Sequence, residues 1–226
     1  MIEQRTLEWH RERQGFFTAS EVGNLMVSGR KKDEMFGETA KNYIKKVVAE
    51  RLVSPDVIDN DYEYSLYLEE NHPVTRAMQW GTDHEDDARN QYAESTGFKV
   101  ELAPSIKHSE IEYFSCSPDG MVGDDGLVEI KCQQPTNFDD NAYLIITGGD
   151  LKDINKMYYW QVQAQMCITG RKWCDFVLYH PKQQPYFVCT RIERNEEDIA
   201  TLMERVKAAE TIAEERVKVL RVKDDF

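Results

Sequence analysis

Three side chains in the segment SPDGMVGDDGLVEIKC have types and spacing that could support chemistry. Glu129 and Lys131 lie two residues apart in a short apolar run, so on a strand they point to the same face. Asp119 lies ten residues before Glu129, and a turn at 123–126 would bring the two carboxylates together. Converging carboxylates repel each other unless a cation lies between them, and hard oxygen ligands favour Mg²⁺ or Mn²⁺. Lys131 would stand beside that cation, where it could orient a water for attack on a phosphodiester.

The same residues also fit simpler explanations. A Glu–Lys pair on one strand face is commonly a surface ion pair. The runs Asp119–Gly120 and Asp124–Asp125–Gly126 could be plain turns or a calcium loop, although the spacing of an EF-hand is not met. The carbonyl of Ile130 could supply another ligand to a cation. On spacing alone, the nuclease interpretation and the plain hairpin both stay open.

The elements that would position these residues follow from the apolar periodicity. Helices are expected at 35–53, 74–95, 153–169 and 196–222, and strands at 98–102, 111–117, 127–132, 173–180 and 186–192. Strands 111–117 and 127–132 are expected to pair through the turn, with Val128, Ile130 and Cys132 facing the core. Helices, then a mixed sheet, then helices indicate an α/β domain.

Two of the expected helices carry apolar faces. In the helix at 74–95, the face is formed by Trp80, His84, Ala88 and Tyr92. The last helix would begin at Asn195 as N-cap, with Asp198 in a variant of the capping box. Its apolar stripe would serve as core or subunit contact. The stripe consists of Ile199, Leu202, Val206, Ala209, Ala213, Val217 and Leu220.

Composition limits the class of protein. The chain has 226 residues, 41% of them hydrophobic, and no linker divides it, so one globular domain is expected. It contains no apolar run long enough for a membrane span, and its charged N-terminus predicts no secretory signal. The cysteines at 116, 132, 167, 174 and 189 form no CxxC pair, which favours reduced, buried thiols in the cytoplasm.

Charge is distributed unevenly along the chain. The net charge is −13, yet residues 1–51 carry ten Lys/Arg against eight Asp/Glu. The densest basic cluster is Arg30, Lys31 and Lys32. A basic N-terminal third on an acidic body could be a DNA-facing surface or a solvated surface loop.

Four ordered segments resemble PD-(D/E)xK nucleases, and among them the lambda exonuclease and YqaJ-type viral recombinase family. The resemblance spans about residues 8–192 and implies a restriction-endonuclease-like core, a central mixed β-sheet flanked by helices. It implies one nuclease domain: a basic, helical DNA-end-binding part at about 1–53, a catalytic core at about 74–192 and a C-terminal helix at about 196–222. The segments are WHRERQGFFTASEVGNLM (9–26), MQWGTDHEDDAR (78–89), SPDG…VEIKC (117–132) and YYWQVQAQM (158–166).

The resemblance also implies roles for residues at the catalytic centre. Asp119, Glu129 and the Ile130 carbonyl would hold metal ions, with Glu85 completing the site directly or through water. Two Mg²⁺ ions are expected per site, and Mn²⁺ could substitute. Lys131 would position the attacking water. A simpler explanation for Glu85 is an acid on a helix surface.

Further roles concern the DNA end. Gln161 would hydrogen-bond near the nucleophile or the lysine. Arg13 and Ser20 would bind the 5′-phosphate, with Gly15 ending one helix and Thr18 or Ser20 opening the next. Arg30 would track the duplex, and Met78 would take the place of an apolar wedge that separates the terminal base pairs. In each case the alternative is a structural or surface residue.

The activity implied by the resemblance is that of a Mg²⁺-dependent 5′-to-3′ exodeoxyribonuclease with a two-metal mechanism. It would degrade one strand of linear duplex DNA from 5′-phosphorylated ends, release 5′-mononucleotides and leave a 3′ single strand for phage-type recombination. The implied partners are double-stranded DNA ends, two further copies in a ring-shaped homotrimer and a single-strand annealing recombinase. The protein would act in the cytoplasm of a bacterial host and be encoded by a phage or prophage.

Two other functions remain open. One is an endonuclease on the same core, such as a restriction or junction-resolving enzyme, which would need no end sensor at Arg13 and Ser20. The other is a non-catalytic subunit that binds DNA ends, although the complete set of Asp119, Glu129 and Lys131 argues against it. No GxxxxGK[ST] phosphate loop is present, so an ATP-driven helicase-nuclease is not expected.

Overall fold

The computed structural model of the protein describes residues 4–31 and 33–221. Lys32, in the predicted basic cluster, and position 222, at the end of the predicted last helix, therefore lie outside the described residues. The helices are α1 Leu7–Arg13, α2 Glu38–Arg51, α3 Pro55–Ile58, α4 Asp61–Asn71, α5 Arg76–Thr96, α6 Pro135–Ile146, α7 Leu151–Ile154, α8 Lys156–Thr169 and α9 Glu196–Arg221, with a 3₁₀ turn, η1, at Val22–Met26. The strands are β1 Phe17–Thr18, β2 Val100–Glu101, β3 Ile106–Lys107, β4 Phe114–Cys116, β5 Gly120–Val122, β6 Gly126–Lys131, β7 Trp173–Tyr179 and β8 Phe187–Glu193.

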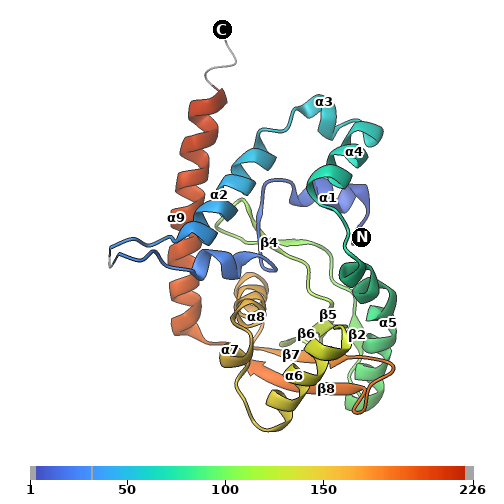
Figure 1. Cartoon of the computed structure of the whole chain (residues 1–226). Helices are drawn as coiled ribbons and strands as arrows, with labels where there is room; N and C mark the ends of the chain where they lie inside the picture. The colour runs from blue at the N-terminus through green and yellow to red at the C-terminus, as the bar shows by residue number, and fades with distance from the viewer. Residues whose placement is uncertain (1–3, 32, 222–226) are drawn as a thin grey trace.

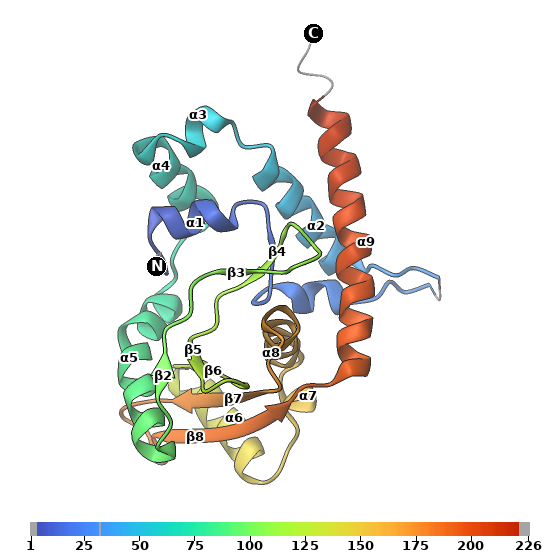
Figure 2. The same cartoon turned by 180° about the vertical axis from the view of Figure 1, so that it is seen from behind.

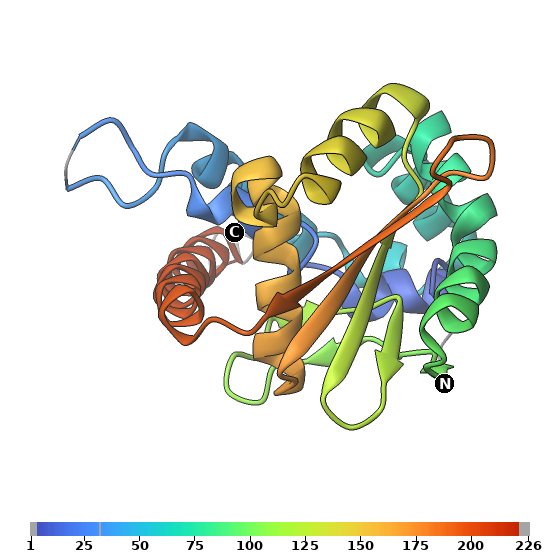
Figure 3. The same cartoon turned by 90° about the horizontal axis from the view of Figure 1, so that it is seen from below.

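The larger sheet has five strands in the order β2-β5-β6-β7-β8. Strand β6 pairs parallel with β7, and the other neighbours are antiparallel, so the predicted mixed sheet is confirmed. The parallel connection runs through α6, α7 and α8, as a crossover between parallel strands requires. Figure 3 shows the strands of this sheet from below, with helices on both sides.

A smaller sheet, β1-β4-β3, lies toward the N-terminal helices in Figures 1 and 2. Strand β1 pairs parallel with β4, with Phe17 opposite Phe114. This pairing joins the N-terminal segment to the strand that directly precedes the SPDG turn. The chain therefore brings residues 9–20 beside residues 114–119, although about a hundred positions separate them.

Helices cover both faces of the five-stranded sheet. On one face, Ala88 and Tyr92 of α5 pack against Val128 and Val177 of the sheet. On the other face, α6, α8 and α9 contribute to a larger core that continues to α2 and η1. Because both faces of β6 are covered, a charged side chain on this strand is buried as well.

Helices α5 and α8 have well-defined ends. Thr75 caps α5 by accepting a hydrogen bond from a backbone N–H, and Asn155 does the same for α8. Gly97 and Gly170 end these helices in the left-handed region, at φ 73° and 71°, which glycine adopts without steric cost. Both helices carry cleft residues, so their fixed ends define where those side chains lie.

The predicted helices agree well with the structure, with three differences in detail. The segment 153–169 divides at Asn155, which caps α8 and ends α7. Asn195 does cap α9, accepting from the backbone N–H of Glu197 and Asp198, but the Asp198 side chain bonds to Lys152 and Tyr159 and completes no capping box. All members of the predicted α9 stripe are buried except Leu220, which is exposed because the helix extends beyond the core at its C-terminal end.

The predicted hairpin of strands 111–117 and 127–132 was wrong in its first strand. Strand 127–132 pairs with β5, Gly120–Val122, and not with 111–117, because β4 belongs to the smaller sheet. Val128 and Ile130 face the core as predicted, Cys132 is only partly buried, and Glu129 on the opposite face is buried as well, at 2% exposed. Trp80, His84, Ala88 and Tyr92 do lie on one face of α5, where Trp80 stacks on His84.

The buried thiols are fewer than predicted, because Cys132, Cys167 and Cys189 are only partly buried. Cys116 and Cys174 are buried. Within the described ranges, no helix is both long and apolar enough to span a membrane.

Replacing Gly120 by alanine is expected to lower the melting temperature by at least about 3 °C. An alanine Cβ would lie 2.2 Å from a methyl of Val100 and 2.9 Å from one of Val128, and these β-branched side chains have little rotational freedom. Overpacking of this kind costs about 1–3 kcal/mol, and about 1 kcal/mol shifts Tm by about 2–4 °C in a chain of this size. Thermal unfolding followed by circular dichroism measures the effect.

Gly81 provides the control, because a Cβ there meets no atom within 4 Å. It lies inside α5, so Gly81→Ala should hold or raise Tm through helix propensity. Equal Tm values for the two variants would contradict the packing argument at Gly120.

Candidate active site

A single cleft, with a volume of about 1080 Å³, lies between the N-terminal segment, α5, the β5–β6 hairpin and α8. It contains every predicted site residue except Arg30. Those lining it are Arg13, Ser20, Met78, Glu85, Asp119, Glu129, Ile130, Lys131 and Gln161. The sequence segments that carry the predicted motifs therefore meet at one place.

Asp119 directly precedes β5 and is fixed to the neighbouring strand. Its Oδ2 accepts a hydrogen bond of 2.7 Å from the backbone N–H of Ile130. Gly120 lies opposite Val128 in the antiparallel register, so Asp119 comes beside Glu129, as predicted. Burial raises the pKa of Asp119 well above its usual value, and the nearby Glu129 and Glu85 raise it further.

Glu129 is held by three donors. Its Oε1 accepts hydrogen bonds of 2.6 Å from Lys131 Nζ and from Gln161 Nε2. Its Oε2 accepts one of 2.6 Å from Nε2 of Gln165. The carboxylate is thus buried and oriented, and α8 supplies both amides.

Lys131 is a protonated cation at neutral pH. Burial lowers the pKa of its ammonium group, but Glu129 and Asp119 more than offset this, so that the pKa lies above its usual value. Its Nζ also lies 5.1 Å from the centre of the Tyr158 ring, a favourable cation–π distance. Lys131 can therefore donate hydrogen bonds and supply positive charge, but it is not suited to act as a base.

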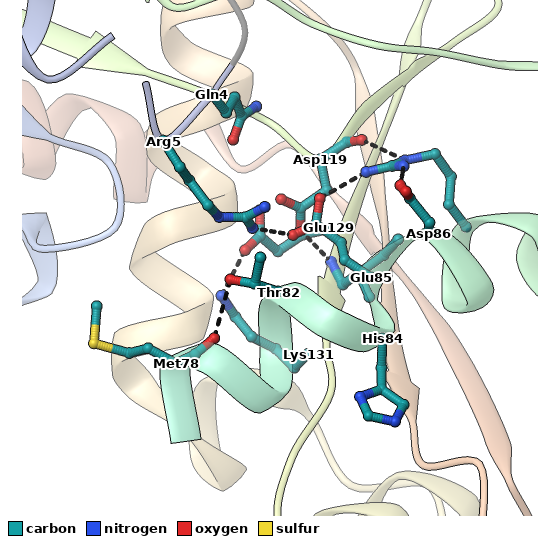
Figure 4. Close-up of polar contacts among 12 residues, drawn as sticks. Gln4, Arg5, Met78, Thr82, His84, Glu85, Asp86, Asp119, Glu129 and Lys131 are labelled. Atoms are coloured by element: carbon teal, nitrogen blue, oxygen red, sulfur yellow. Dashed lines mark hydrogen bonds and ion pairs between the residues drawn. The ribbon is translucent and has the colours of Figure 1, made fainter. Parts of the chain in front are cut away.

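Glu85 points into the cleft from α5 and is paired with two arginines. Arg89, one turn later, bonds to it at 2.6 Å, and Arg5 of the N-terminal segment forms a second ion pair. Arg89 also donates to the backbone oxygen of Asp119. Figure 4 shows the side chains of Arg5, Glu85, Asp119, Glu129 and Lys131 gathered together, with His84 turned away.

The acidic side chains suit a hard divalent cation. Asp119 Oδ2 receives one donor and Glu129 Oε2 receives one, so each carboxylate keeps accepting capacity. The pKa of Asp119 is raised first by burial and then by the negative charge of Glu129 and Glu85, and a cation would relieve the repulsion among these acids. Residues 4–31 and 33–221 contain no group of three or more His, Cys, Asp or Glu side chains that could hold a metal. Glu85 is instead paired with Arg5 and Arg89.

Arg13 ends α1 and projects into the same cleft. Its Nη1 donates to Ser117 Oγ at 2.9 Å, and its guanidinium lies 4.3 Å from the centre of the Trp9 ring. Burial lowers the pKa of this guanidinium. Among the described residues, no carboxylate forms a salt bridge with Arg13. Glu21 and Glu50 act on Arg13 electrostatically, but its direct contacts with Ser117 and Trp9 are neutral, and such a partly desolvated cation can bind an anion.

Ser20 lies near Arg13 at the cleft but does not cap a helix. Its hydroxyl lies 3.2 Å from that of Thr18, and η1 begins two residues later with Glu21 in the N-cap position. Thr18 lies in β1, so the prediction that it could open a helix was wrong. The predicted break at Gly15 is confirmed, since α1 ends at Arg13 and Gly15 has φ 72°.

Met78 and Arg30 occupy very different positions. Met78 lies in the first turn of α5, 56% exposed at the cleft, where an apolar group could contact DNA. Arg30 is exposed in the loop between η1 and α2, which projects beyond α9 and α2 in Figures 1 and 2. This loop lies on the far side of the molecule from α5, so Arg30 of this chain does not join the cleft.

Sequence reasoning missed Gln165, Arg89 and Arg5. Gln165 had a detectable signal, since it follows Gln161 by one helical turn and must share its face. Arg89 likewise follows Glu85 at i+4. Arg5 had no such signal, because only the tertiary structure brings the N-terminal segment to α5.

Residues 8–172 match the YqaJ-like viral recombinase domain. The chain belongs to this family. No curated protein sequence matches the chain significantly. An alkaline exonuclease from Laribacter hongkongensis is 33% identical, with a TM-score of 0.78 over 97% of this chain and 98% of that one. The same exonuclease in complex with dAMP gives a TM-score of 0.77, again at 33% identity over 97% and 98% of the two chains.

The YqaJ-like fold is shared more widely. A phage-related exonuclease from Haemophilus somnus 129PT is 15% identical, with a TM-score of 0.68 over 91% of this chain and 96% of that one. The domain match and the 33% identical exonuclease confirm the predicted family, and all these structures confirm the PD-(D/E)xK fold. Family membership, together with the likeness to an exonuclease over nearly the whole chain, supports a nuclease.

Proposed function

We propose that the protein is a Mg²⁺-dependent exodeoxyribonuclease that degrades one strand of linear duplex DNA from a 5′-phosphorylated end. The observation that carries this proposal is Arg13, a guanidinium that forms no salt bridge with a described residue and lies in the same cleft as Asp119, Glu129 and Lys131. An anion site beside a carboxylate–lysine set suits an enzyme that holds one phosphate and cuts at the next.

Different residues of the chain bind the terminal phosphate and the cation. Arg13 binds the terminal phosphate, with Ser20 beside it, and so fixes the position of the next phosphodiester. Asp119, Glu129 and the Ile130 carbonyl would hold the cation, with Glu85 completing the site directly or through water. Bound there, Mg²⁺ would stabilise charge on the phosphate and lower the pKa of a water ligand.

Lys131 and Gln161 complete the proposed catalytic set. Lys131 is positively charged and lies at Glu129, where it stabilises negative charge that develops on the phosphate and orients the attacking water. Gln161 donates a hydrogen bond to the same oxygen of Glu129 as Lys131 and holds it in place. Both donors keep this carboxylate directed toward the cleft.

The remaining features of the proposal rest on the family. Release of 5′-mononucleotides is in keeping with the relative that was solved with dAMP. The proposal also includes two cations per site, a homotrimeric ring and a strand-annealing partner protein. It further includes a cytoplasmic location in the bacterial host and a role in phage recombination. Finally, we propose that Arg30 contacts the duplex and that Met78 contacts the terminal base pair.

Replacing Arg13 by alanine is expected to slow digestion of 5′-phosphorylated duplex by about 10- to 100-fold. A hydrogen bond to a charged group contributes about 1.5–3 kcal/mol, and about 1.4 kcal/mol corresponds to tenfold. Cutting of 5′-hydroxyl duplex, which lacks the bound group, should change little. Time courses of both linear substrates, with and without Mg²⁺, measure the two rates.

Arg11→Ala is the matched control, because Arg11 lies on the same helix but pairs with Asp61 outside the cleft. It should keep the preference for phosphorylated ends. If Arg13→Ala also kept its full preference, the end sensor would lie elsewhere. Cleavage of closed circular DNA by the wild type would favour the endonuclease alternative instead.

A further inference from the structure

Gln165 has a feature that the proposed function does not explain. Its side chain is 1% exposed and lines the cleft. Its Nε2 donates to Glu129 Oε2, while its carbonyl Oε1 is buried and has no hydrogen-bond partner among the described residues. The opposite orientation of the amide would place its oxygen against the carboxylate, so the donor must face Glu129.

The two oxygens of Glu129 are not equivalent. Oε1 already receives Lys131 and Gln161, whereas Oε2 receives Gln165 alone. A carboxylate oxygen has two lone pairs, so Oε2 is the oxygen with room for a cation. Gln165 is therefore the residue that fixes the direction of the free lone pair.

We propose that Gln165 is a positioning residue for the divalent cation at the catalytic centre. Its amide N–H₂ sets Glu129 Oε2, and its unpartnered carbonyl accepts a hydrogen bond from a water that accompanies the cation. An unpaired buried carbonyl is costly, and such a water would satisfy it. This role rests on the proposed function, because it concerns the cation of the same site.

A neighbouring glutamine allows a matched comparison. Gln163 is also fully buried on α8, but it faces away from the cleft. Its Nε2 donates to the Glu193 carbonyl, and its Oε1 accepts from the Asn195 N–H, so it joins α8 to the start of α9. Gln163 thus has two satisfied bonds and no contact with Glu129.

The test compares Gln165→Met with Gln163→Met, since methionine has nearly the same shape without the amide. Ca²⁺ binding to the DNA-free protein, measured by calorimetry, is expected to weaken about tenfold or more in Gln165→Met, because a bond to a charged group is lost. In Gln163→Met the affinity should stay within about twofold of wild type, while Tm falls, since two buried bonds are lost.

A second measurement separates positioning from a general structural effect. Gln165→Met should need about tenfold more Mg²⁺ for half-maximal cleavage, yet approach the wild-type rate at saturating Mg²⁺. Should Gln165→Met not fold, Gln165→Asn carries the test, because its amide is one methylene too short to reach Glu129.

The outcomes are distinct. Unchanged Ca²⁺ affinity in a folded Gln165 variant would overturn the role of Gln165 and leave the nuclease proposal intact. The same would follow if the Gln163 variant lost as much affinity. A wild-type protein that binds neither Ca²⁺ nor Mg²⁺ would instead overturn the proposed function itself.

Discussion

Replacing Asp119 by alanine is expected to reduce cleavage of linear duplex DNA by about 10⁴-fold or more, the scale on which loss of one member of a catalytic set acts. Asp119 is the half-buried carboxylate beside Glu129 that keeps an oxygen without a donor among the described residues. Replacing Asp119 removes a ligand of the cation. It leaves intact the contact that Arg13 makes with the terminal phosphate. DNA binding in Ca²⁺, measured by fluorescence anisotropy, should therefore remain within a fewfold of wild type.

A second variant excludes simple misfolding. Asp119→Asn can still accept the hydrogen bond from the Ile130 N–H, and it removes a charge that Glu129 and Glu85 repel. Its Tm in EDTA should therefore equal or exceed that of the wild type, although cleavage is lost. Wild-type turnover by either variant in Mg²⁺ would show that the SPDG…VEIKC hairpin is not the catalytic centre.

Replacing Lys131 by alanine is expected to slow cleavage by about 10²- to 10⁴-fold, the range for a positioned group that stabilises charge in the transition state. Lys131 is a cation whose pKa is raised by Glu129 and Asp119 despite burial, so it is charged at every pH at which the protein would be assayed. Unlike the Gln165 variants, Lys131→Ala should not be rescued by saturating Mg²⁺. Single-turnover rates across a Mg²⁺ series distinguish the two.

Calcium binding separates the possible roles of Lys131. Gln161 and Gln165 still hold Glu129 in the variant, so Ca²⁺ affinity should stay within about threefold of wild type. Lys172→Ala is the control, because Lys172 pairs with Asp125 at the exposed turn of the same hairpin and should cut normally. If Ca²⁺ affinity collapsed in Lys131→Ala, its main role would be to hold Glu129.

Helices α2, α5, α8 and α9 were predictable, because apolar periodicity reports burial on one face regardless of the partner, whereas α4 and α6 were not predicted. The α5 face ending at Tyr92 and the α9 stripe are examples. The strands were less so. A segment of three residues, such as β5, has no periodicity to detect, and its residues Gly120–Val122 looked like part of a turn. As a result, the strand that pairs with β6 was misidentified.

The chemistry of the site was determined by local sequence. Glu129 and Lys131 lie on the same face of one strand, and the turn at 123–126 brings Asp119 beside them whichever strand precedes the turn. The i, i+4 spacing places Gln161 and Gln165 on one side of α8 for the same reason. Short-range geometry sufficed there, because strand and helix repeats are fixed by the backbone.

Only the tertiary structure decided which distant groups join the residues of the β5–β6 hairpin and α8. Pairing of β1 with β4 brings Arg13 to Ser117, and packing of α5 brings Glu85 to Asp119. Burial on both faces of β6 makes Glu129 a desolvated carboxylate rather than a surface acid. Desolvation and long-range contact depend on the whole packed core, which no local spacing encodes, so the charge state and partners of the cleft emerge only on folding.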